Sequence, residues 1–311
     1  MTLRLGTRGS ALALAQSRTV ADALTAATGE PVELVEITTA GDRSSAPVQQ
    51  LGVGVFVSAL REALHAKEID FAVHSYKDLP TAPADGLRVA AIPVREDPRD
   101  ALISRDGRLL AELPVGTRIG TGATRRVAQL LALGSGLECV PLRGNVDTRL
   151  RKVAEGELDA VVLAAAGLHR LGRGEEITEV LDPMLMLPAP AQGALAVECR
   201  ADALAPNGAD LVELLSSLDD EPTRFAVTAE RALLATLEAG CSAPVAALAV
   251  VAEGDDGQLE IYLRGAVLSP DGGFAVRLSA TGALAEAAEI GRRLAGDLLA
   301  EGADNVLGVH A

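Results

Sequence analysis

The stretch Ile69-Asp-Phe-Ala-Val-His-Ser-Tyr-Lys-Asp-Leu-Pro80 predicts both the fold class and the place of the chemistry. Its first half, residues 69–73, is apolar and predicts a buried strand, and Pro80 prevents a regular strand from continuing. The loop between them carries polar groups at His74, Ser75, Lys77 and Asp78. Open α/β sheets build their sites from such groups at the carboxyl ends of strands. Asp78 is therefore the first candidate for chemistry, although an aspartate at this place is also a common turn residue.

The same order of elements occurs twice along the chain. Arg4-Leu-Gly-Thr7 resembles Arg118-Ile-Gly-Thr121, and Glu68-Ile-Asp70 resembles Glu157-Leu-Asp159. Each time the order is strand, Gly-Thr turn, helix, strand, helix, strand. Short matches arise easily by chance, but their common order predicts a pair of similar α/β lobes with mostly parallel sheets.

The C-terminal part has a different pattern. A helix is expected over residues 221–238, with Glu230 on its polar side, and another over 283–301. Between them, apolar or alternating runs are separated by Gly-Asp-Asp-Gly and Ser-Pro-Asp-Gly-Gly, which are hairpin turns. The pattern predicts a small α+β domain with a three-stranded antiparallel sheet. The expected domains are residues 1–93 with 190–215, residues 94–189, and residues 216–311.

Composition excludes several classes of partner. The 311 residues carry a net charge of −15, which argues against nucleic acid and anionic membranes. No apolar run approaches the roughly 18 residues of a membrane span, and the N-terminus has no apolar signal core, so we expect a cytoplasmic protein.

Cysteine usage argues against a disulfide framework and against a cysteine zinc site, and we expect no metal. Cys139 and Cys199 lie in apolar strands and are expected in the core, whereas Cys241 lies in a Gly-Cys-Ser loop where it could be exposed and reactive.

Positive charge is concentrated between residues 117 and 173, where nine Lys and Arg stand against five Asp and Glu. Arg125 and Arg126 open a helix directly after Thr121-Gly-Ala-Thr124. A helix N-terminus and two planar guanidinium groups suit a carboxylate or phosphate. The alternative is an exposed first turn with surface arginines, which would oppose the helix dipole.

A second arginine pair flanks the next expected helix start, in Leu142-Arg-Gly-Asn-Val-Asp-Thr-Arg-Leu150. Arg143 and Arg149 could both point toward a cleft. The alternative is that Arg149, Arg151 and Lys152 lie on a solvated helix face. If the two lobes face each other, their strand-end loops line one cleft. The candidates there are Arg8, Ser10, Ser75, Lys77 and Asp78 from the first lobe, and Thr121, Thr124, Arg125, Arg126, Arg143, Asn145, Arg149 and Arg170 from the second.

Several motifs in this order resemble the porphobilinogen deaminase family. They are His74-Ser-Tyr-Lys-Asp-Leu-Pro80, Arg95-Glu-Asp-Pro-Arg-Asp100, Leu142-Arg-Gly-Asn145, Gln192-Gly-Ala194 and Leu237-Glu-Ala-Gly-Cys241. The resemblance implies two lobes like those of periplasmic binding proteins and a third, C-terminal domain. It also implies an enzyme of tetrapyrrole (haem) biosynthesis. Such an enzyme condenses four porphobilinogen molecules head to tail, releases ammonia at each step, and frees hydroxymethylbilane by hydrolysis.

The resemblance also implies roles for individual residues. The family's product chain grows from a dipyrromethane cofactor held by a thioether, and the matching cysteine is Cys241. The family's catalytic aspartate matches Asp78. Its cofactor- and substrate-carboxylate positions fall on Arg8, Ser10, Lys77, Thr121, Arg125, Arg126, Arg143, Arg149 and Arg170, with weaker matches at Gln16, Ser75 and Asn145. The expected partner is porphobilinogen alone, and a monomer is expected.

The chain departs from the family pattern at three places. Leu51-Gly-Val-Gly54 stands where the family commonly has Gly-Gly-Lys-Gly, Ala123 removes a hydroxyl from a turn, and Ala191 stands where glycine is frequent. A rival hypothesis is a two-lobed binding protein or sensor for a small carboxylate ligand. A covalent cofactor would distinguish the enzyme from such a protein.

Overall fold

The computed structural model describes residues 2–38, 55–205, 207–237, 244–254 and 257–307. The chain divides into two compact units, Met1–Glu96 with Ala194–Arg224 and Asp97–Gly193 with Phe225–Ala311. The three-domain boundaries expected from the sequence stay a prediction.

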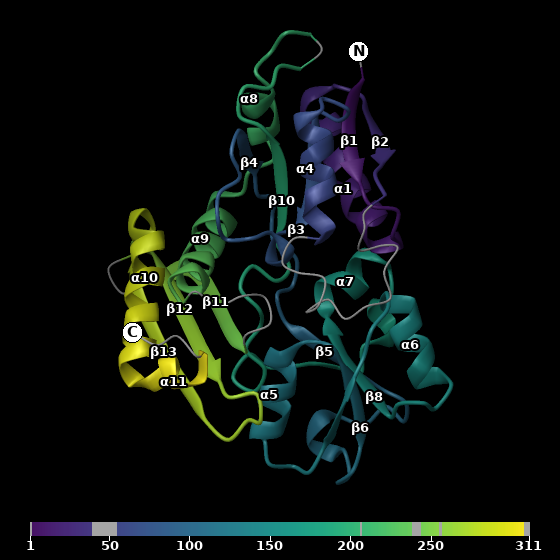
Figure 1. Ribbon diagram of the computed structural model, residues 1–311, viewed down its shortest axis with the longest axis vertical. Coiled ribbons are helices and arrows are strands. Elements are labelled where there is room, and N and C mark those ends of the chain that lie inside the picture. Colours follow the sequence, from purple (N-terminus) through teal and green to yellow (C-terminus); the bar gives the residue numbers. More distant parts are fainter. Residues whose placement is uncertain (1, 39–54, 206, 238–243, 255–256, 308–311) are drawn as a thin grey trace. The chain divides into compact units, whose positions relative to one another are not determined.

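The first unit is built on a five-stranded sheet with the strand order β2-β1-β3-β10-β4 (Figure 1). Strand β1 pairs in parallel with β2 and β3, whereas β10 is antiparallel to both β3 and β4. The sheet is therefore mixed, and β10 is its reversed strand. The strands are β1 (Leu3–Thr7), β2 (Val32–Glu36), β3 (Phe71–Ser75), β4 (Leu87–Ala91) and β10 (Leu195–Arg200), and the helices are α1 (Ala11–Thr28), α4 (Val55–His65) and α8 (Leu211–Ser216), with a 3-10 turn η1 (Tyr76–Asp78).

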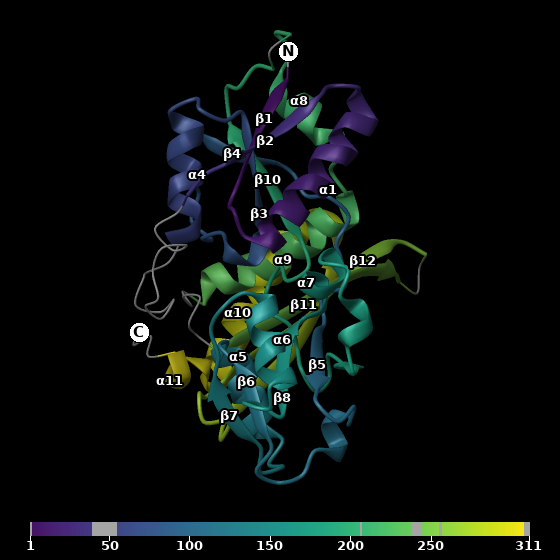
Figure 2. The same cartoon turned by 90° about the vertical axis from the view of Figure 1, so that its right-hand side faces the viewer.

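Alternation along β3 explains how this sheet is covered on both faces. Phe71 and Val73 pack in one core with Val20 and Leu24 of α1. Ala72, between them, points to the opposite face and packs with Leu60 of α4. Figure 2 shows α1 and α4 on either side of the strands. Both faces of the sheet are thus buried, as expected where helices connect parallel strands.

Strand β3 begins and ends two residues later than the sequence predicts. The expected strand was 69–73, whereas β3 spans Phe71–Ser75. Pairing with the reversed strand β10 extends it, because Ala196 and Leu195 lie opposite His74 and Ser75. This long-range pairing is not visible in the local sequence.

The second unit holds a sheet of the same design, with the order β7-β6-β8-β5-β9. Strand β6 is parallel to β7 and β8, and β5 is the reversed strand, antiparallel to β8 and β9. The strands are β5 (Asp100–Ser104), β6 (Arg118–Thr121), β7 (Glu138–Pro141), β8 (Ala160–Ala164) and β9 (Glu179–Val180), and the helices are α5 (Thr124–Ala132), α6 (Val146–Ala154) and α7 (Ala165–Arg170), with 3-10 turns η2 (Leu110–Glu112) and η3 (Gly174–Glu176).

The predicted repeat is confirmed at the level of single atoms. The Asp70 carboxylate accepts from the Arg4 backbone N–H at 2.8 Å, and the Asp159 carboxylate accepts from the Arg118 N–H at 3.0 Å. In return the Asp70 and Asp159 backbone N–H groups donate to the Arg4 and Arg118 carbonyls at 2.9 and 3.0 Å. Each aspartate therefore locks the first strand of its repeat, β1 or β6, to the third strand of that repeat, β3 or β8.

The C-terminal part of the second unit is a three-stranded antiparallel sheet, as predicted, with strand order β11-β12-β13. Its buried face packs against α9 and α10 through Leu233, Ile261, Leu263 and Leu294 (Figure 1). The elements are β11 (Val245–Glu253), β12 (Leu259–Leu268), β13 (Ala275–Ala283), α9 (Glu221–Thr236), α10 (Ala287–Leu298) and α11 (Asp304–Leu307), with a 3-10 turn η4 (Leu284–Glu286) and a π-helical turn η5 (Leu299–Ala303).

Candidate functional site

Asp78 lies on η1, directly after β3, and its side chain is exposed. The turn itself is fixed: the Tyr76 N–H donates to the Ala194 carbonyl at 3.0 Å, and the Leu79 N–H donates to the Tyr76 carbonyl at 3.2 Å. The Leu79 side chain is buried. Lys77 is half-buried beside Asp78. A carboxylate on an anchored turn at the end of a strand is held in place while remaining accessible.

Ser75 and Gln16, two weaker candidates, contact each other. The Gln16 amide donates to Ser75 Oγ at 3.0 Å, and Ser75 Oγ lies 3.3 Å from Gln16 Oε1. Gln16 is on α1 and is buried. The pair therefore joins α1 to the end of β3.

Ser10 is the N-cap of α1, and its Oγ accepts from the Ala13 N–H at 3.3 Å. This bond satisfies one of the free N–H groups at the start of the helix. Arg8 follows β1 and is half-buried. The end of β1 therefore places a cation and a helix N-terminus at the carboxyl edge of the first sheet.

A carboxylate that sequence reasoning missed lies beside the Asp78 strand. Glu198 of β10 accepts from Arg61 of α4, with Nη2–Oε1 at 2.8 Å, and its Oε2 lies 3.3 Å from His74 Nε2. Burial raises the pKa of Glu198, but its contacts with His74 and Arg61 outweigh burial and lower the pKa below its ordinary value. His74 thus packs at the strand end beside this carboxylate.

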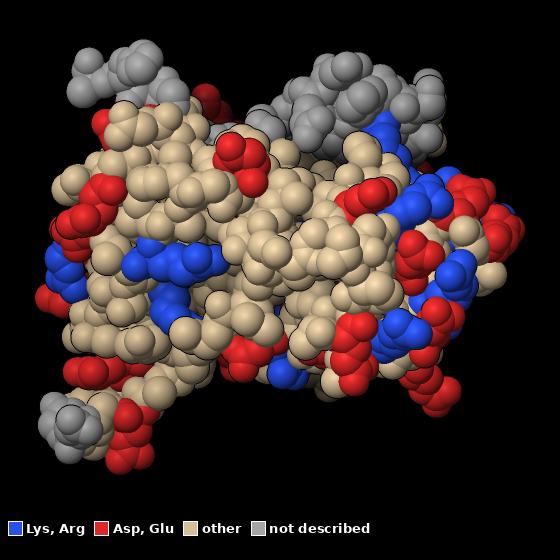
Figure 3. Space-filling model, turned by 90° about the horizontal axis from the view of Figure 1, so that it is seen from below, with Lys and Arg blue, Asp and Glu red and all other residues tan. Residues whose placement is uncertain are grey.

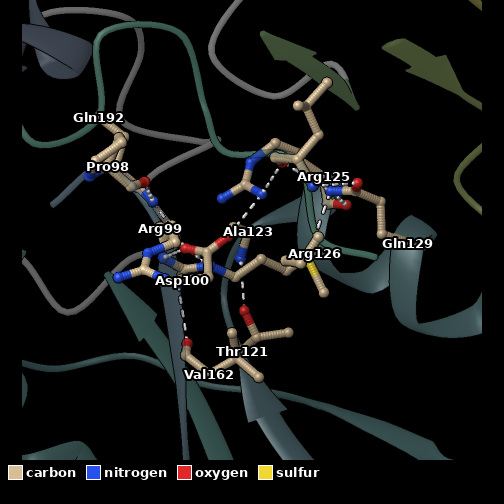
Figure 4. Close-up of polar contacts among 12 residues, drawn as sticks. Pro98, Arg99, Asp100, Thr121, Ala123, Arg125, Arg126, Gln129, Val162 and Gln192 are labelled. Carbon is tan, nitrogen blue, oxygen red and sulfur yellow. Dashed lines mark hydrogen bonds and ion pairs between the residues drawn. The ribbon is translucent and has the colours of Figure 1, made fainter. Parts of the chain in front are cut away.

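In the second unit, α5 begins with two buried arginines that share one buried carboxylate, Asp100 (Figure 4). Arg125 Nη1 lies 2.8 Å from Asp100 Oδ2. Arg126 donates to Asp100 Oδ1 through Nε at 3.0 Å and through Nη2 at 2.7 Å. The exposed first turn considered from the sequence is therefore wrong for this pair, and the partner that offsets their charge is Asp100.

Asp100 is ionised within this cluster. Burial would raise the pKa of Asp100, but the charges of Arg125 and Arg126 and their hydrogen bonds hold it well below its usual range. Burial in turn lowers the pKa of the Arg125 guanidinium from its ordinary value, although Asp100 opposes this. In the sequence, Asp100 was only the last residue of the motif Arg95-Glu-Asp-Pro-Arg-Asp100, and no role was predicted for it.

The turn before α5 shows what Ala123 changes. Ala123 is the N-cap of α5, and its side chain caps no N–H group. The buried Thr121 hydroxyl instead holds the N-cap residue, because its Oγ1 accepts from the Ala123 N–H at 3.4 Å. Thr124 is the first residue of the helix. The helix start is thus organised from the end of β6.

Arg149 lies within electrostatic reach of two other candidate arginines. The pKa of Arg149 is lowered to about 10. Burial is the largest cause, and the positive charges of Arg126 and Arg143 add to it. Its Nε donates to the Gly144 carbonyl at 2.8 Å. A cation whose pKa falls because of neighbouring cations lies in a region of excess positive charge, which favours an anionic ligand.

Two further candidates make contacts within the fold. Arg170, the last residue of α7, donates from Nη2 to the Gly193 carbonyl at 2.6 Å. Asn145 is the N-cap of α6, and its Oδ1 accepts from the Thr148 N–H at 2.9 Å. Arg170 thus contacts the segment around Gly193, and the Asn145 oxygen is used as a cap.

Two other cations of the basic stretch, Lys152 and Arg173, are paired at the surface. Lys152 lies 2.5 Å from Glu157, and Arg173 contacts Asp147 and Glu176. On the face seen in Figure 3, Lys and Arg side chains lie next to Asp and Glu side chains. Such exposed pairs contribute little to stability. The functional interest is therefore in the inner arginines rather than in a basic surface.

Cys241 and the 51–54 segment lie outside the described residues, so their predicted roles are not tested by the structure. Cys199 is buried, and burial raises its pKa to about 11. Burial also raises the pKa of the half-buried Cys139. Both thiols are therefore protonated at neutral pH.

The sequence predicted Glu230 on the polar side of its helix, and this prediction is wrong. Glu230 is fully buried, and its two oxygens accept from the Ala191 N–H at 2.5 Å and the Ala249 N–H at 2.7 Å. The helical pattern could not reveal this, because both partners come from distant strands and loops.

The described part of the chain offers neither a metal cluster nor a membrane-spanning helix. No group of three or more His, Cys, Asp or Glu there could hold a metal ion. None of the described helices is long and apolar enough to cross a membrane.

Comparison with known proteins gives matches over nearly the whole chain. Residues 3–206 match the family model of the porphobilinogen deaminase dipyromethane cofactor binding domain, and residues 224–300 match that of the porphobilinogen deaminase C-terminal domain. Porphobilinogen deaminase of Nocardia farcinica is 61% identical over 309 residues, which covers 98% of this chain and 88% of the relative. Porphobilinogen deaminase of Mycobacterium tuberculosis (strain ATCC 25618 / H37Rv) is 58% identical over 309 residues, with 98% of each chain covered.

Among solved structures, an ABC transporter periplasmic substrate-binding protein from Coxiella burnetii has a TM-score of 0.43 and 13% identity, covering 74% of this chain and 96% of that chain. A likeness of this size carries no information about function.

Proposed function

The chain belongs to the porphobilinogen deaminase family, and from this premise we propose that it condenses four porphobilinogen molecules head to tail and releases hydroxymethylbilane after hydrolysis. In each condensation the bond from the aminomethyl carbon to nitrogen breaks, ammonia leaves, and a carbon–carbon bond to the next pyrrole forms. The enzyme is a transferase of tetrapyrrole biosynthesis. The observation that carries this function is the 61% identity over 98% of the chain to a named porphobilinogen deaminase.

The donor set at the carboxyl edge of the second lobe fits a dipyrromethane cofactor. Two pyrroles that each bear an acetate and a propionate present carboxylates, and planar guanidinium groups bind carboxylates bidentately. When bound, the cofactor supplies the primer to which the first substrate pyrrole is joined. We assign this binding to Arg125, Arg126, Arg143, Arg149 and Arg170, with Thr121 at the same strand end and Arg8, Ser10 and Lys77 from the first lobe. The excess positive charge around Arg149 supports this assignment.

Cys241 is proposed as the attachment point. The residues on either side of its loop are anchored in the second unit: the Leu237 N–H donates to the Leu233 carbonyl, and the Pro244 carbonyl accepts from the Leu268 N–H, both at 3.1 Å. Burial raises the pKa of Cys199 and of Cys139, which makes both thiols poorer nucleophiles and is consistent with Cys241 as the reactive thiol.

Asp78 is proposed as the catalytic carboxylate. Its exposed oxygens can accept hydrogen bonds from pyrrole N–H groups, stabilise the positive charge left when ammonia departs, and take up the pyrrole proton released after coupling. The bonds that hold η1 keep Asp78 in one place during these steps. Gln16, Ser75 and Asn145 are proposed to position this machinery, since their side chains bond within the fold.

We also propose a cytoplasmic monomer with three domains that takes neither nucleic acid nor a membrane as partner. The net charge of −15 supports the absence of polyanionic partners. Size-exclusion chromatography tests the oligomeric state, and a mass near twice that of the chain would contradict the monomer.

The test of the function is the fate of porphobilinogen. We expect the purified protein to consume it, to release about one ammonia for each molecule consumed, and to form a linear tetrapyrrole. The rival binding protein would bind porphobilinogen without releasing ammonia. No consumption by a folded protein would contradict the enzyme.

A further inference from the structure

Asp100 occupies a special place in the second sheet. It is the first residue of β5, and it lies opposite Ala164, the last residue of β8. Because β5 is the reversed strand, its first residue lies at the carboxyl edge of the parallel strands. A buried carboxylate is thereby brought to the edge where α5 begins, and its exposed fraction is 0%.

Asp100 Oδ1 accepts hydrogen bonds, whereas Oδ2 makes an ion pair and accepts no hydrogen bond from the described residues. Oδ2 lies 2.8 Å from Arg125 Nη1, and Oδ1 accepts from Arg126 Nε and Nη2 and from Gln192 Nε2 at 2.9 Å. Gln192 also donates to the Pro98 carbonyl at 2.8 Å. Gln192 thus joins the carboxylate to the chain at Pro98, just before β5.

The two arginines differ in which guanidinium N–H groups remain available for a ligand. Arg126 uses its Nε–Nη2 edge on Asp100 and donates from Nη1 to the Val162 carbonyl at 2.9 Å. Arg125 uses only Nη1, for Asp100 and for the Leu187 carbonyl at 2.6 Å. No acceptor among the described residues contacts Arg125 Nε or Nη2. That edge is the one with which a guanidinium binds a carboxylate bidentately.

We propose that Asp100 is a positioning residue that presents the Nε–Nη2 edge of Arg125 to a carboxylate of porphobilinogen, or of the chain that grows from it, and cancels one of the two arginine charges. This narrows the assignment made above for the arginine pair: Arg126 uses its guanidinium to hold Asp100 and Val162, and Arg125 is the member that contacts the ligand. The remaining single charge matches a single carboxylate. This inference rests on the proposed function, since it assigns the arginine pair to that site.

The test is Asp100→Asn. Asparagine keeps the shape and one oxygen for Arg126, but it turns an N–H group toward Arg125 Nη1, so two donors face each other. Arg125 then loses its orientation. We expect the KM for porphobilinogen to rise about tenfold or more, as for the loss of one charge-assisted hydrogen bond. We expect kcat at saturation to fall less.

A second readout does not depend on turnover. Porphobilinogen should raise the Tm of the wild-type holoenzyme, and this shift should shrink or vanish in Asp100→Asn. A wild-type protein that never consumes porphobilinogen would defeat the proposed function, whereas an equal Tm shift in wild type and variant would defeat the role of Asp100.

The matched control is Asp159→Asn in the same unit. Asp159 also accepts a strand backbone N–H, from Arg118, but at the opposite edge of the sheet. The Asp159→Asn variant should have a lower Tm and an unchanged KM for porphobilinogen. If Asp100→Asn does not fold, Asp100→Glu keeps the charge while moving the carboxylate by one methylene, and its KM should also rise. A KM within twofold of wild type in either folded Asp100 variant overturns the proposal.

Discussion

The backbone N–H of Ala191 donates to the Glu230 carboxylate at 2.5 Å while Ala191 itself lies in the left-handed region, with φ at 59°. A non-glycine residue there is strained by roughly 1–2 kcal/mol. Glu230 offsets this strain, because it accepts both this N–H and that of Ala249 in β11. Glu230 thus fixes the segment before Gln192 against the C-terminal sheet.

Replacing Ala191 with glycine should therefore stabilise the protein. Glycine adopts positive φ without strain, but it loses about 0.5–1 kcal/mol through the entropy of the unfolded chain. We expect a net gain of a few tenths of a kcal/mol to about 1 kcal/mol, measured by denaturant unfolding. The control is Gly193→Ala, at φ of 88°, which should destabilise. A less stable Ala191→Gly variant would show that the strain is not relieved.

The variant Asp78→Asn should nearly stop turnover while leaving the cofactor attached. Asparagine cannot take up a proton or balance a positive charge, and general acid–base catalysis contributes about 10²–10⁴-fold. We expect kcat to fall by about that factor with an unchanged Tm, because the Asp78 side chain is exposed. Steady-state kinetics with porphobilinogen provide the measurement. Wild-type turnover in this variant would remove Asp78 from its role.

Acid sensitivity should depend on Glu198. Its folded pKa is lowered, so its contribution to stability is present above its unfolded pKa of about 4.3 and is lost as the pH falls through the folded value. The fall in Tm between pH 7 and a pH below the folded pKa of Glu198 should therefore be smaller in Glu198→Gln than in wild type. Glu157→Gln is the control, because Glu157 is paired with Lys152 at the surface, where solvent screens the pair. Equal acid sensitivity in Glu198→Gln and wild type would contradict this account.

Close packing of α10 on α9 should depend on Gly291. A Cβ there would lie 2.2 Å from the Ala229 carbonyl oxygen, so the helices would have to move apart. Gly291→Ala should cost about 1–3 kcal/mol of unfolding free energy, as overpacking does. Gly296, exposed on the same helix, has no atom within 4 Å of such a Cβ, and Gly296→Ala should stabilise by about 1 kcal/mol. Equal effects of the two substitutions would contradict the packing shown here.

The sequence predicted what depends on local pattern and on order along the chain. The paired lobes followed from repeated motifs, and Asp70 and Asp159 indeed make the same contacts in each lobe. The antiparallel C-terminal sheet followed from its hairpin turns. These features are encoded within short windows, so reading a single chain is sufficient to find them.

Features that depend on the reversed strands were missed. Asp100 and Glu198 both lie on strands that insert antiparallel into the sheets, and their partners are distant in sequence. Arg126 is 26 residues from Asp100, and Arg61 is 137 residues from Glu198. A helix-start arginine pair looks the same in sequence whether it meets solvent, a ligand or a buried aspartate. Only the order and direction of the strands in the folded sheet show which of these three environments the pair has.

The most direct test of the central claim is the intact mass of the purified protein. We predict a mass above that of the polypeptide by a two-pyrrole adduct in wild type, and the bare polypeptide mass in Cys241→Ser, with Cys139→Ser as a control that retains the adduct. A folded wild-type protein at the bare polypeptide mass, or an adduct that persists in Cys241→Ser, would contradict the account.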